Sequence, residues 1–320
     1  MLARYMFPVP RATADTVYMC ENAAAPAIPD ALRHIAGAKH IVYYYLGLDP
    51  NVPVPACDTF TVKAASSAPH AIQLSYQTAR PKLVLEGCSL LNPLPTNAPH
   101  ITLRKCRDFT HPIKADTIEL ARCTNPPTAL VQARRRLILN QVTFTADDTV
   151  IETGAHVRVL ACKGKLTLKC GPVVYLAQIA SVPTLVNPVR ALAIIHCDEI
   201  FPSASRVLEK YVQAEVVYYA ASTAQNIVCG QGGKQLRVLA LQDIGPARCV
   251  MNCPSLQTLI LVHAAVERLQ VTPTKGIWLY GLESRIPEKV PRRAFLSTAE
   301  WSKDMLEETG ALFEELQAAW

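Results

Sequence analysis

Only a few residues of this chain have types and spacing that could support chemistry. Residues 230–234 read Gly-Gln-Gly-Gly-Lys, but a phosphate-binding loop needs a glycine where Val228 stands and a Ser or Thr after Lys234. Cys249 and Cys253 lie four residues apart, but zinc would need a second close pair of Cys or His, and the sequence has none at that spacing. We therefore expect no cofactor and no metal site.

Candidate catalytic groups are equally sparse. His196 precedes Cys197 directly, whereas a thiol nucleophile and its base normally meet in space rather than as sequence neighbours. Glu86 and Glu119 are the nearest candidates for a carboxylate pair acting on polysaccharide. The basic run 134–136 has no interleaved aromatics, so a solvated turn is favoured over a nucleic-acid contact. The sequence predicts that the protein is not an enzyme and does not bind nucleic acid.

The composition is that of a folded chain with many extended connections. Half of the 320 residues are apolar, 18% are charged, and 24 prolines stand against 13 glycines. The N-terminal stretch has no continuous apolar run, and no window approaches the roughly 18 apolar residues of a membrane helix. We expect no membrane association, and we expect the eleven cysteines to be reduced thiols of a cytoplasmic protein.

Short apolar-x-apolar segments recur along the chain, and the second apolar residue of each serves as an anchor. The mean gap between anchors is 20 residues. The anchors are Met19, Tyr43, Val62, Leu85, Leu103, Leu120, Leu139, Val159, Leu176, Ile194, Tyr218, Leu241, Leu261 and Leu279. Candidate strands at Leu74 and Leu168 are skipped to obtain this register.

Five cysteines support the register, because each lies three residues after an anchor. They are Cys88, Cys106, Cys123, Cys162 and Cys197. A strand that ends and turns inward needs a small side chain at that point, and a thiol packs as a small hydrophobe while donating weakly to a backbone carbonyl. The spacing predicts a buried column of small side chains at the turns.

Two turns complete a longer pattern, L-x-x-L-x-L-x-x-φ, over residues 236–244 and 256–264. This pattern resembles the leucine-rich-repeat family, and the irregular spacing and cysteine-rich turns look most like its short-turn or BspA-like members. The resemblance covers about 270 residues, from Thr16 to Leu282. It implies a repeat solenoid with one parallel β-sheet. The proline-rich links predict mostly non-helical returns.

Two other folds stay open, a right-handed parallel β-helix and an all-β sandwich. Under the preferred interpretation, residues 1–15 are a lead-in, 16–285 a solenoid of about 14 turns, and 286–320 a linker with an amphipathic C-terminal capping helix. Ser297 and Glu300 form the capping box that predicts the start of this helix. The segment from 297 carries one basic and six acidic residues. It is expected either to cap the solenoid or to cover its concave face.

In a leucine-rich repeat the residues on either side of each anchor face outward, onto the concave sheet face. These positions are polar and charged in turns three to eight and apolar or aromatic in turns nine to fourteen. The predicted partner-binding residues are Lys63, Arg104, Arg158, Tyr175, Ile195, Tyr219, Ile260, Val262, Trp278 and Tyr280. An apolar stripe of this length indicates a protein partner, self-coverage by the C-terminal helix or a second copy, or burial of the sheet on both faces.

These features predict a non-enzymatic scaffold that binds a protein or peptide on its concave face, with a homodimer as a further option. The alternative is a parallel β-helix protein that acts on or adheres to polysaccharide. A substrate adaptor of a ubiquitin pathway is a third class, for which the sequence shows no adaptor-binding box.

Overall fold

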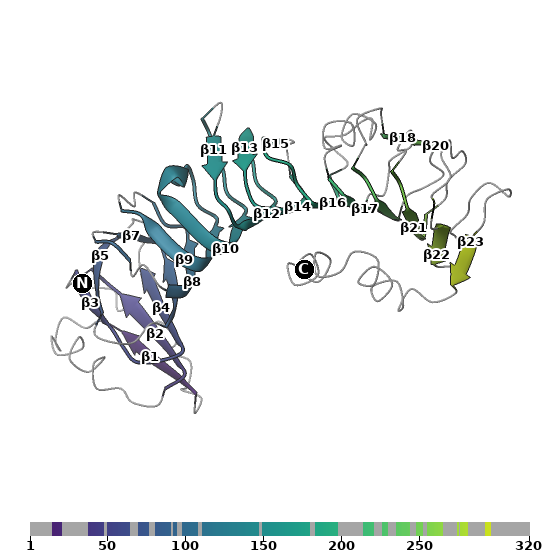
Figure 1. Ribbon diagram of the computed structural model, residues 1–320. Coiled ribbons are helices and arrows are strands. Elements are labelled where there is room, and N and C mark those ends of the chain that lie inside the picture. Colours follow the sequence, from purple (N-terminus) through teal and green to yellow (C-terminus); the bar gives the residue numbers. More distant parts are fainter. Residues whose placement is uncertain are drawn as a thin grey trace, which may run out of the picture. The chain divides into compact units, whose positions relative to one another are not determined.

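The computed structural model describes a large part of the chain in separate ranges. They are 15–20, 38–47, 50–64, 70–76, 81–90, 92–94, 98–107, 111–146, 149–179, 183–197, 214–220, 226–229, 235–243, 248–251, 255–264, 274, 276–280 and 292–295. The chain divides into two compact units, 1–146 and 147–320, which are described one after the other (Figure 1).

Unit 1 contains a main sheet and a smaller second sheet. The main sheet has the order β1 (Thr16–Cys20), β2 (His40–Tyr45), β4 (Thr59–Ala64), β6 (Lys82–Glu86), β8 (Ala98–Arg104), β9 (Ile113–Ala121) and β10 (Val131–Asn140). The second sheet has the order β3 (Asn51–Val54), β5 (His70–Tyr76) and β7 (Cys88–Leu90). A single 3-10 turn, Thr128–Leu130, is the only helical element in the described part of the chain.

Unit 2 repeats the arrangement. Its main-sheet strands follow the order β12 (His156–Leu160), β14 (Val173–Ala177), β16 (Ala191–Ile195), β17 (Val216–Ala220), β19 (Val238–Gln242), β21 (Thr258–Val262), β22 (Gly276–Tyr280) and β23 (Arg292–Phe295). Two small sheets accompany them. One is β11 (Thr149–Glu152), β13 (Leu166–Lys169) and β15 (Thr184–Leu185), and the other is β18 (Asn226–Cys229) and β20 (Arg248–Met251).

The chain is a parallel β-solenoid. Neighbouring main-sheet strands pair in parallel, and the chain returns between them through the segments that carry the second sheets. The sequence predicted a single sheet, and the second sheets are the difference. The two strands that the register skips, at Leu74 and Leu168, are β5 and β13 of these sheets. The physical reason is that the returns carry short apolar segments of their own, with Val52, Leu74 and Leu168 buried, so returns of successive turns pair with one another as strands.

The predicted register is confirmed at nearly every paired strand. In unit 1, Met19 pairs with Tyr43, and the anchors then follow one another in direct register as far as Leu139. In unit 2, Val159, Leu176 and Ile194 continue the pattern, and so do Leu241, Leu261 and Leu279. The anchors from Tyr43 onward that lie in this register are buried because their side chains point into the coil, and Met19 of the first strand is half-buried.

One anchor is wrong by a single residue. The structure pairs Ile194 with Tyr219, and Tyr219 in turn with Leu241, so the anchor of β17 is Tyr219 rather than Tyr218. A one-residue slip moves every side chain of a strand to the other face. Tyr219, predicted to face outward, is therefore an interior residue, 2% exposed, and Tyr218 takes the outward position.

The sheet also runs beyond its predicted end. Strand β23 pairs in parallel with β22, and Ala294 lies opposite Leu279, whereas the solenoid was predicted to end at residue 285. The predicted helix from Ser297 lies outside the described residues, as does most of the linker.

The interior of each coil is built from apolar columns. Each main-sheet strand of unit 1 from β2 to β10 points at least two residues inward, the anchor and the residue two before it. Ile41, Phe60, Leu83, Ile101 and Ile118 form the second of these columns, and none is measurably exposed. Truncating one such side chain to Ala costs roughly 2–5 kcal/mol because the packed neighbours cannot fill the cavity.

A left-handed residue turns the chain at the end of several main-sheet strands. In unit 1, Gly87, Lys105, Arg122 and Gln141 lie two residues after an anchor and have φ between 52° and 72°. The N–H of Lys105 donates to Ala121 O at 2.9 Å, and that of Arg122 to Asn140 O at 2.8 Å. Because of this kink, the residue three after the anchor points inward, and Cys88, Cys106 and Cys123 are buried there as predicted.

Candidate functional site

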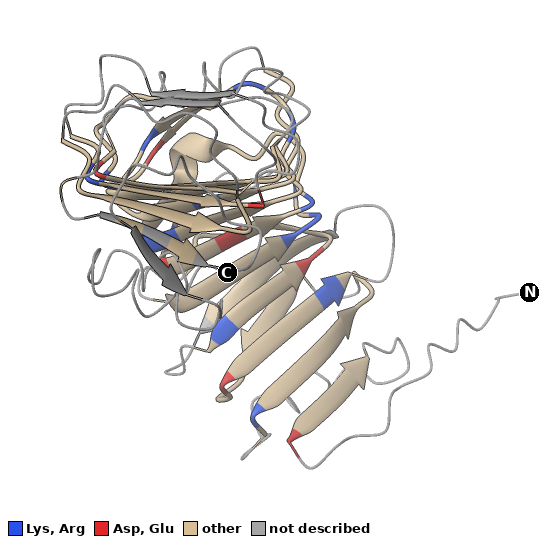
Figure 2. Cartoon of the chain, turned by 90° about the vertical axis from the view of Figure 1, so that its right-hand side faces the viewer, with Lys and Arg blue, Asp and Glu red and all other residues tan. Residues whose placement is uncertain are grey.

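Charged side chains gather on the outer face of unit 1, which is the side of its main sheet opposite the aliphatic interior. Side chains alternate along a strand, so the residues one and three positions before an inward-pointing anchor, and the residue one position after it, face outward. The charged residues stand at these positions. They are Lys63, Lys82, Glu86, His100, Arg104, Glu119 and Arg136. Figure 2 shows charged residues on and at the ends of the sheet strands.

One row of this face brings two predicted binding residues together. Lys63 of β4 lies directly opposite Glu86 of β6, and Glu86 lies opposite Arg104 of β8. The Lys63 Nζ also sits 6.0 Å from the ring centroid of Tyr44 on β2. Arg104 is exposed, and Lys63 and Glu86 are half-buried. The row therefore offers two cations to solvent on either side of a carboxylate.

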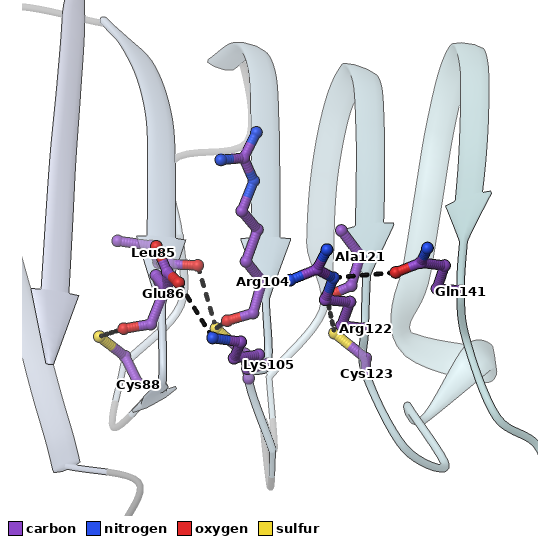
Figure 3. A network of polar contacts seen from close by, with 10 residues as sticks. Leu85, Glu86, Cys88, Arg104, Lys105, Ala121, Arg122, Cys123 and Gln141 are labelled. Atoms are coloured by element: carbon purple, nitrogen blue, oxygen red, sulfur yellow. Dashed lines mark hydrogen bonds and ion pairs between the residues drawn. The ribbon is translucent and has the colours of Figure 1, made fainter. Parts of the chain in front are cut away.

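The turn beside this row is tied together by polar contacts across the strands (Figure 3). Lys105 Nζ lies 3.4 Å from Glu86 Oε1, and Arg122 Nε donates to Gln141 Oε1 at 2.8 Å. Both pairs join left-handed residues to a neighbouring turn. Such exposed pairs add little stability, but they fix where the charged groups stand.

A hydrogen-bonded chain crosses two strands of the same face. Thr102 of β8 donates its hydroxyl proton to Glu119 Oε2 of β9 at 3.2 Å, and His100 Nε2 lies 3.1 Å from Thr102 Oγ1. Because Thr102 gives its one proton to Glu119, the imidazole donates from Nε2 to Thr102. The chain therefore runs from His100 through Thr102 to the Glu119 carboxylate.

The surroundings of His100 disfavour its charged form. Burial lowers the pKa of His100, the positive charges of Lys82 and Arg136 lower it further, and Glu119 opposes them. Thr102 is only 1% exposed, so its hydroxyl does not reach a substrate and is not a nucleophile. The hydrogen bond from Thr102 positions the Glu119 carboxylate.

Glu86 and Glu119, the candidate carboxylate pair, share the outer face but are held apart. They lie two strands and two residues from each other, which places their Cα atoms about 12 Å apart. Each carboxylate has its own partner, Lys105 for Glu86 and Thr102 for Glu119. The arrangement anchors two separate acceptors on the face.

The outer face of unit 2 is an apolar cluster. Tyr175, Ile260 and Val262, predicted for partner binding, are buried in it together with Tyr218, and Ile195 packs against it half-buried. The sequence left open whether these side chains are exposed or buried, and in the structure they are buried. Arg158 lies over the ring of Tyr175, with 4.9 Å between its Cζ and the ring centroid.

The side chains of two predicted binding residues, Trp278 and Tyr280 on β22, lie outside the described part of the structure. Tyr219 belongs to the interior, as the corrected register requires. Lys63, Arg104 and Arg158 are therefore the charged predicted residues that remain on an outer face with at least partial exposure, and Ile195 is the apolar one.

The cysteines are packed as thiols. Burial raises the pKa of Cys88 to about 12 and raises that of Cys123 as well. His196 is exposed while the neighbouring Cys197 is buried, with its sulfur 3.3 Å from Ile195 O, so the two side chains point apart. Within the described ranges, no three His, Cys, Asp or Glu side chains gather to hold a metal ion.

Sequence reasoning missed Lys82, His100, Thr102 and Arg136 as a group. The predicted outward residues are only those directly beside each anchor, whereas the third residue before an anchor faces the same way. Extending the alternation by one step would have found Lys82, His100 and Arg136. Thr102 was seen as an outward residue, but only the structure shows its bond to Glu119.

Comparison with family models, curated proteins and solved structures finds no match to this chain. In the part of the chain that the structure describes, no helix is long and apolar enough to cross a membrane. The functional inference therefore depends on the geometry of the outer faces.

Proposed function

We propose that this protein is a non-enzymatic interaction module that binds a protein or peptide partner on the outer face of unit 1. The observation that carries the proposal is the row of Lys63, Glu86 and Arg104, which stand side by side on three adjacent strands. A rigid parallel sheet holds these groups at fixed spacing, so a partner finds them already in place.

Charge gives this face its selectivity. Of the six Lys, Arg and Glu residues named for this face, four are Lys or Arg and two are Glu, so an acidic segment of a partner is attracted over a distance of roughly 10 Å. Such groups act mainly on association rate and salt dependence. The proposal places first contact on unit 1 because Tyr175, Ile260 and Val262 of unit 2 are buried.

The finer type of the repeat is part of the proposal. A short-turn leucine-rich repeat is supported by the column of turn cysteines, which occupies the N/C position of that family's pattern. The eight cysteines whose side chains the structure describes form no disulfide with one another, which supports a reducing compartment and therefore the cytoplasm.

A capture experiment tests the proposal. The wild type, Lys63→Ala with Arg104→Ala, and Lys39→Ala are each immobilised and exposed to native lysate, and the bound proteins are compared by mass spectrometry. Lys39 is an exposed residue of unit 1 paired with Asp15, so it controls for loss of charge. The proposal predicts proteins retained by the wild type and Lys39→Ala but lost by the double variant. Identical sets on all three would contradict it.

The alternative is a β-helix protein that acts on or adheres to polysaccharide. The second sheets favour it, because a β-helix carries two or three strands in each coil, and Glu86 and Glu119 share one face with Tyr44. A glycan array and a reducing-sugar assay, run with Glu86→Gln and Glu119→Gln, separate the two functions. Binding or cleavage that either substitution abolishes would replace the interaction module with this function.

A further inference from the structure

A second row on the outer face of unit 1 carries two cations and a histidine. It contains Lys82 of β6, His100 of β8, Thr117 of β9 and Arg136 of β10, each three residues before its anchor, and we name it the cationic row. His100 lies directly opposite Thr117, and Thr117 opposite Arg136. Lys82 stands beside His100 because Leu83 pairs with Ile101. All four side chains are half-buried.

The row holds positive charge with no carboxylate among its own members. Glu119 lies on the neighbouring row and is engaged by Thr102 at 3.2 Å, with His100 Nε2 4.0 Å away. Lys82 Nζ makes no ion pair with any described residue. Half-buried cations have lost part of their hydration, so an anionic group that reaches them replaces that hydration with charge-assisted hydrogen bonds.

We propose that the cationic row binds the acidic side chains of an extended peptide segment that crosses the strands. The occupant is a partner segment with Asp or Glu at every second position. This inference rests on the proposed function and identifies the chemistry of the partner.

The spacing of the row fits that occupant. Neighbouring strands are about 4.8 Å apart, so Lys82 and Arg136, three strands apart, are separated by roughly 14 Å. In an extended peptide, side chains on one face repeat every ~6.7 Å, so residues i and i+4 are separated by about 13 Å. Carboxylates at i and i+4 therefore reach Lys82 and Arg136, and that at i+2 lies over His100 and Thr117. The Arg136 guanidinium can take a carboxylate in a bidentate pair.

The same face argues against a nucleic acid as the occupant. Glu119 stands on the row next to the cationic row, and Glu86 stands one row further along the strands, so a continuous phosphate backbone would meet their repulsion. A peptide avoids it, because uncharged residues can alternate with the acidic ones. The mixed face therefore favours a spaced pattern of carboxylates over a polyanion.

The experiment uses the full-length protein and a fluorescein-labelled peptide, Gly-Glu-Thr-Glu-Thr-Glu-Gly, in low-salt buffer at pH 7. Binding is followed by fluorescence anisotropy, and the matched peptide carries Gln in place of each Glu. We expect Lys82→Ala with Arg136→Ala to raise the Kd by about tenfold or more, because both end contacts are lost. Lys39→Ala is expected to stay within about twofold of the wild type because this surface pair lies outside the row.

A charge-swap variant distinguishes loss of peptide binding from loss of folding. Lys82→Glu with Arg136→Glu should lose the acidic peptide and gain a peptide with Lys at the three Glu positions. Equal affinity of the wild type for the Glu and Gln peptides would overturn the proposal. So would displacement of the Glu peptide by inorganic phosphate or by a single-stranded oligonucleotide at lower concentration than unlabelled peptide.

Failure of the cationic-row proposal can be distinguished from failure of the proposed function. If the Glu peptide binds equally to the wild type and to the cationic-row variant, while Lys63→Ala with Arg104→Ala still loses its captured partners, only the cationic row is wrong. If the captured partners are also unchanged, the outer face of unit 1 is not an interaction surface.

Discussion

The sulfur of Cys106 lies 3.2 Å from the carbonyl oxygen of Leu85, the anchor of the preceding turn, and 3.4 Å from that of Arg104 on its own strand. Cys123 repeats the relationship one turn later, with its sulfur 3.4 Å from Leu103 O. A thiol is a weak hydrogen-bond donor, so it stabilises the turn mainly by its size. The sulfur fills the space in the turn and lies against the nearby carbonyl oxygens. The turn cysteines are thus structural connections between successive coils.

Substitution at Cys106 tests this role. Cys106→Ala keeps a small apolar side chain and should lower the free energy of unfolding by about 1 kcal/mol. Cys106→Asp places a carboxylate at a buried site without a cation and should cost more than about 3 kcal/mol. Urea denaturation measures both, with Cys57→Ala, outside the column, as the control. An unchanged unfolding midpoint for Cys106→Asp would show that the turn does not hold this side chain inside.

Thiol reactivity should follow burial. Burial raises the pKa of Cys88 to about 12 and that of Cys170 to about 11, so at pH 8 these thiols are protonated and shielded. Iodoacetamide should leave the buried column unmodified in the native protein and label all eleven cysteines after unfolding without reductant. Peptide mapping by mass spectrometry gives the answer. Pairs of cysteines that resist alkylation after unfolding would reveal disulfides and contradict the reducing compartment.

The free energy of unfolding should decrease as the pH falls below 7 because of His100. Its pKa is lowered below 6.5 in the folded state, so the unfolded chain binds the proton more readily. The contribution of His100 is therefore complete above pH 6.5 and is lost as the pH falls through the folded pKa. His100→Gln, which keeps an N–H for Thr102, should flatten the decline between pH 7 and pH 5. His40→Gln, at an exposed histidine of β2, is the control, and equal slopes for the two variants would refute the assignment.

The corrected register of β17 predicts an energetic coupling. Tyr218 donates to Gln242 Oε1 at 2.5 Å, which requires Tyr218 on the outer face. A double-mutant cycle with Tyr218→Phe and Gln242→Ala should give a coupling energy of about 1 kcal/mol. The same cycle with Tyr219→Phe should give none, since Tyr219 points into the coil. Coupling at Tyr219 instead would restore the register predicted from the sequence.

The sequence predicted most of the fold because one periodic signal repeats. An apolar anchor about every 20 residues and a small residue three positions later specify parallel strands and inward turns. The signal failed at residues 216–220, Val-Val-Tyr-Tyr-Ala. Both the odd-numbered and the even-numbered residues of this strand are apolar or aromatic, so the periodicity does not show which of them point inward. It also missed β23, whose anchor position holds Ala294 rather than a large aliphatic residue.

The candidate site was predictable only in part. Lys63 and Arg104 follow from the alternation of a strand, and the structure places them on one row with Glu86. The link from His100 to Glu119 joins different strands through Thr102. Such a link depends on rotamers and on which strands are neighbours, and neither is encoded in local spacing. The burial of Tyr175 is likewise a property of the folded unit.

Photo-crosslinking from the outer face of unit 1 tests the central claim most directly. Thr61→p-benzoylphenylalanine places the probe on β4, one residue before the anchor Val62 and next to Lys63, and Val186→p-benzoylphenylalanine places it at an exposed residue of unit 2. Both variants are irradiated in native lysate, and adducts are identified by mass spectrometry. The account predicts a partner adduct from position 61 that Lys63→Ala with Arg104→Ala abolishes, and no such adduct from position 186. An adduct from position 186 alone, or equal adducts from both, would contradict it.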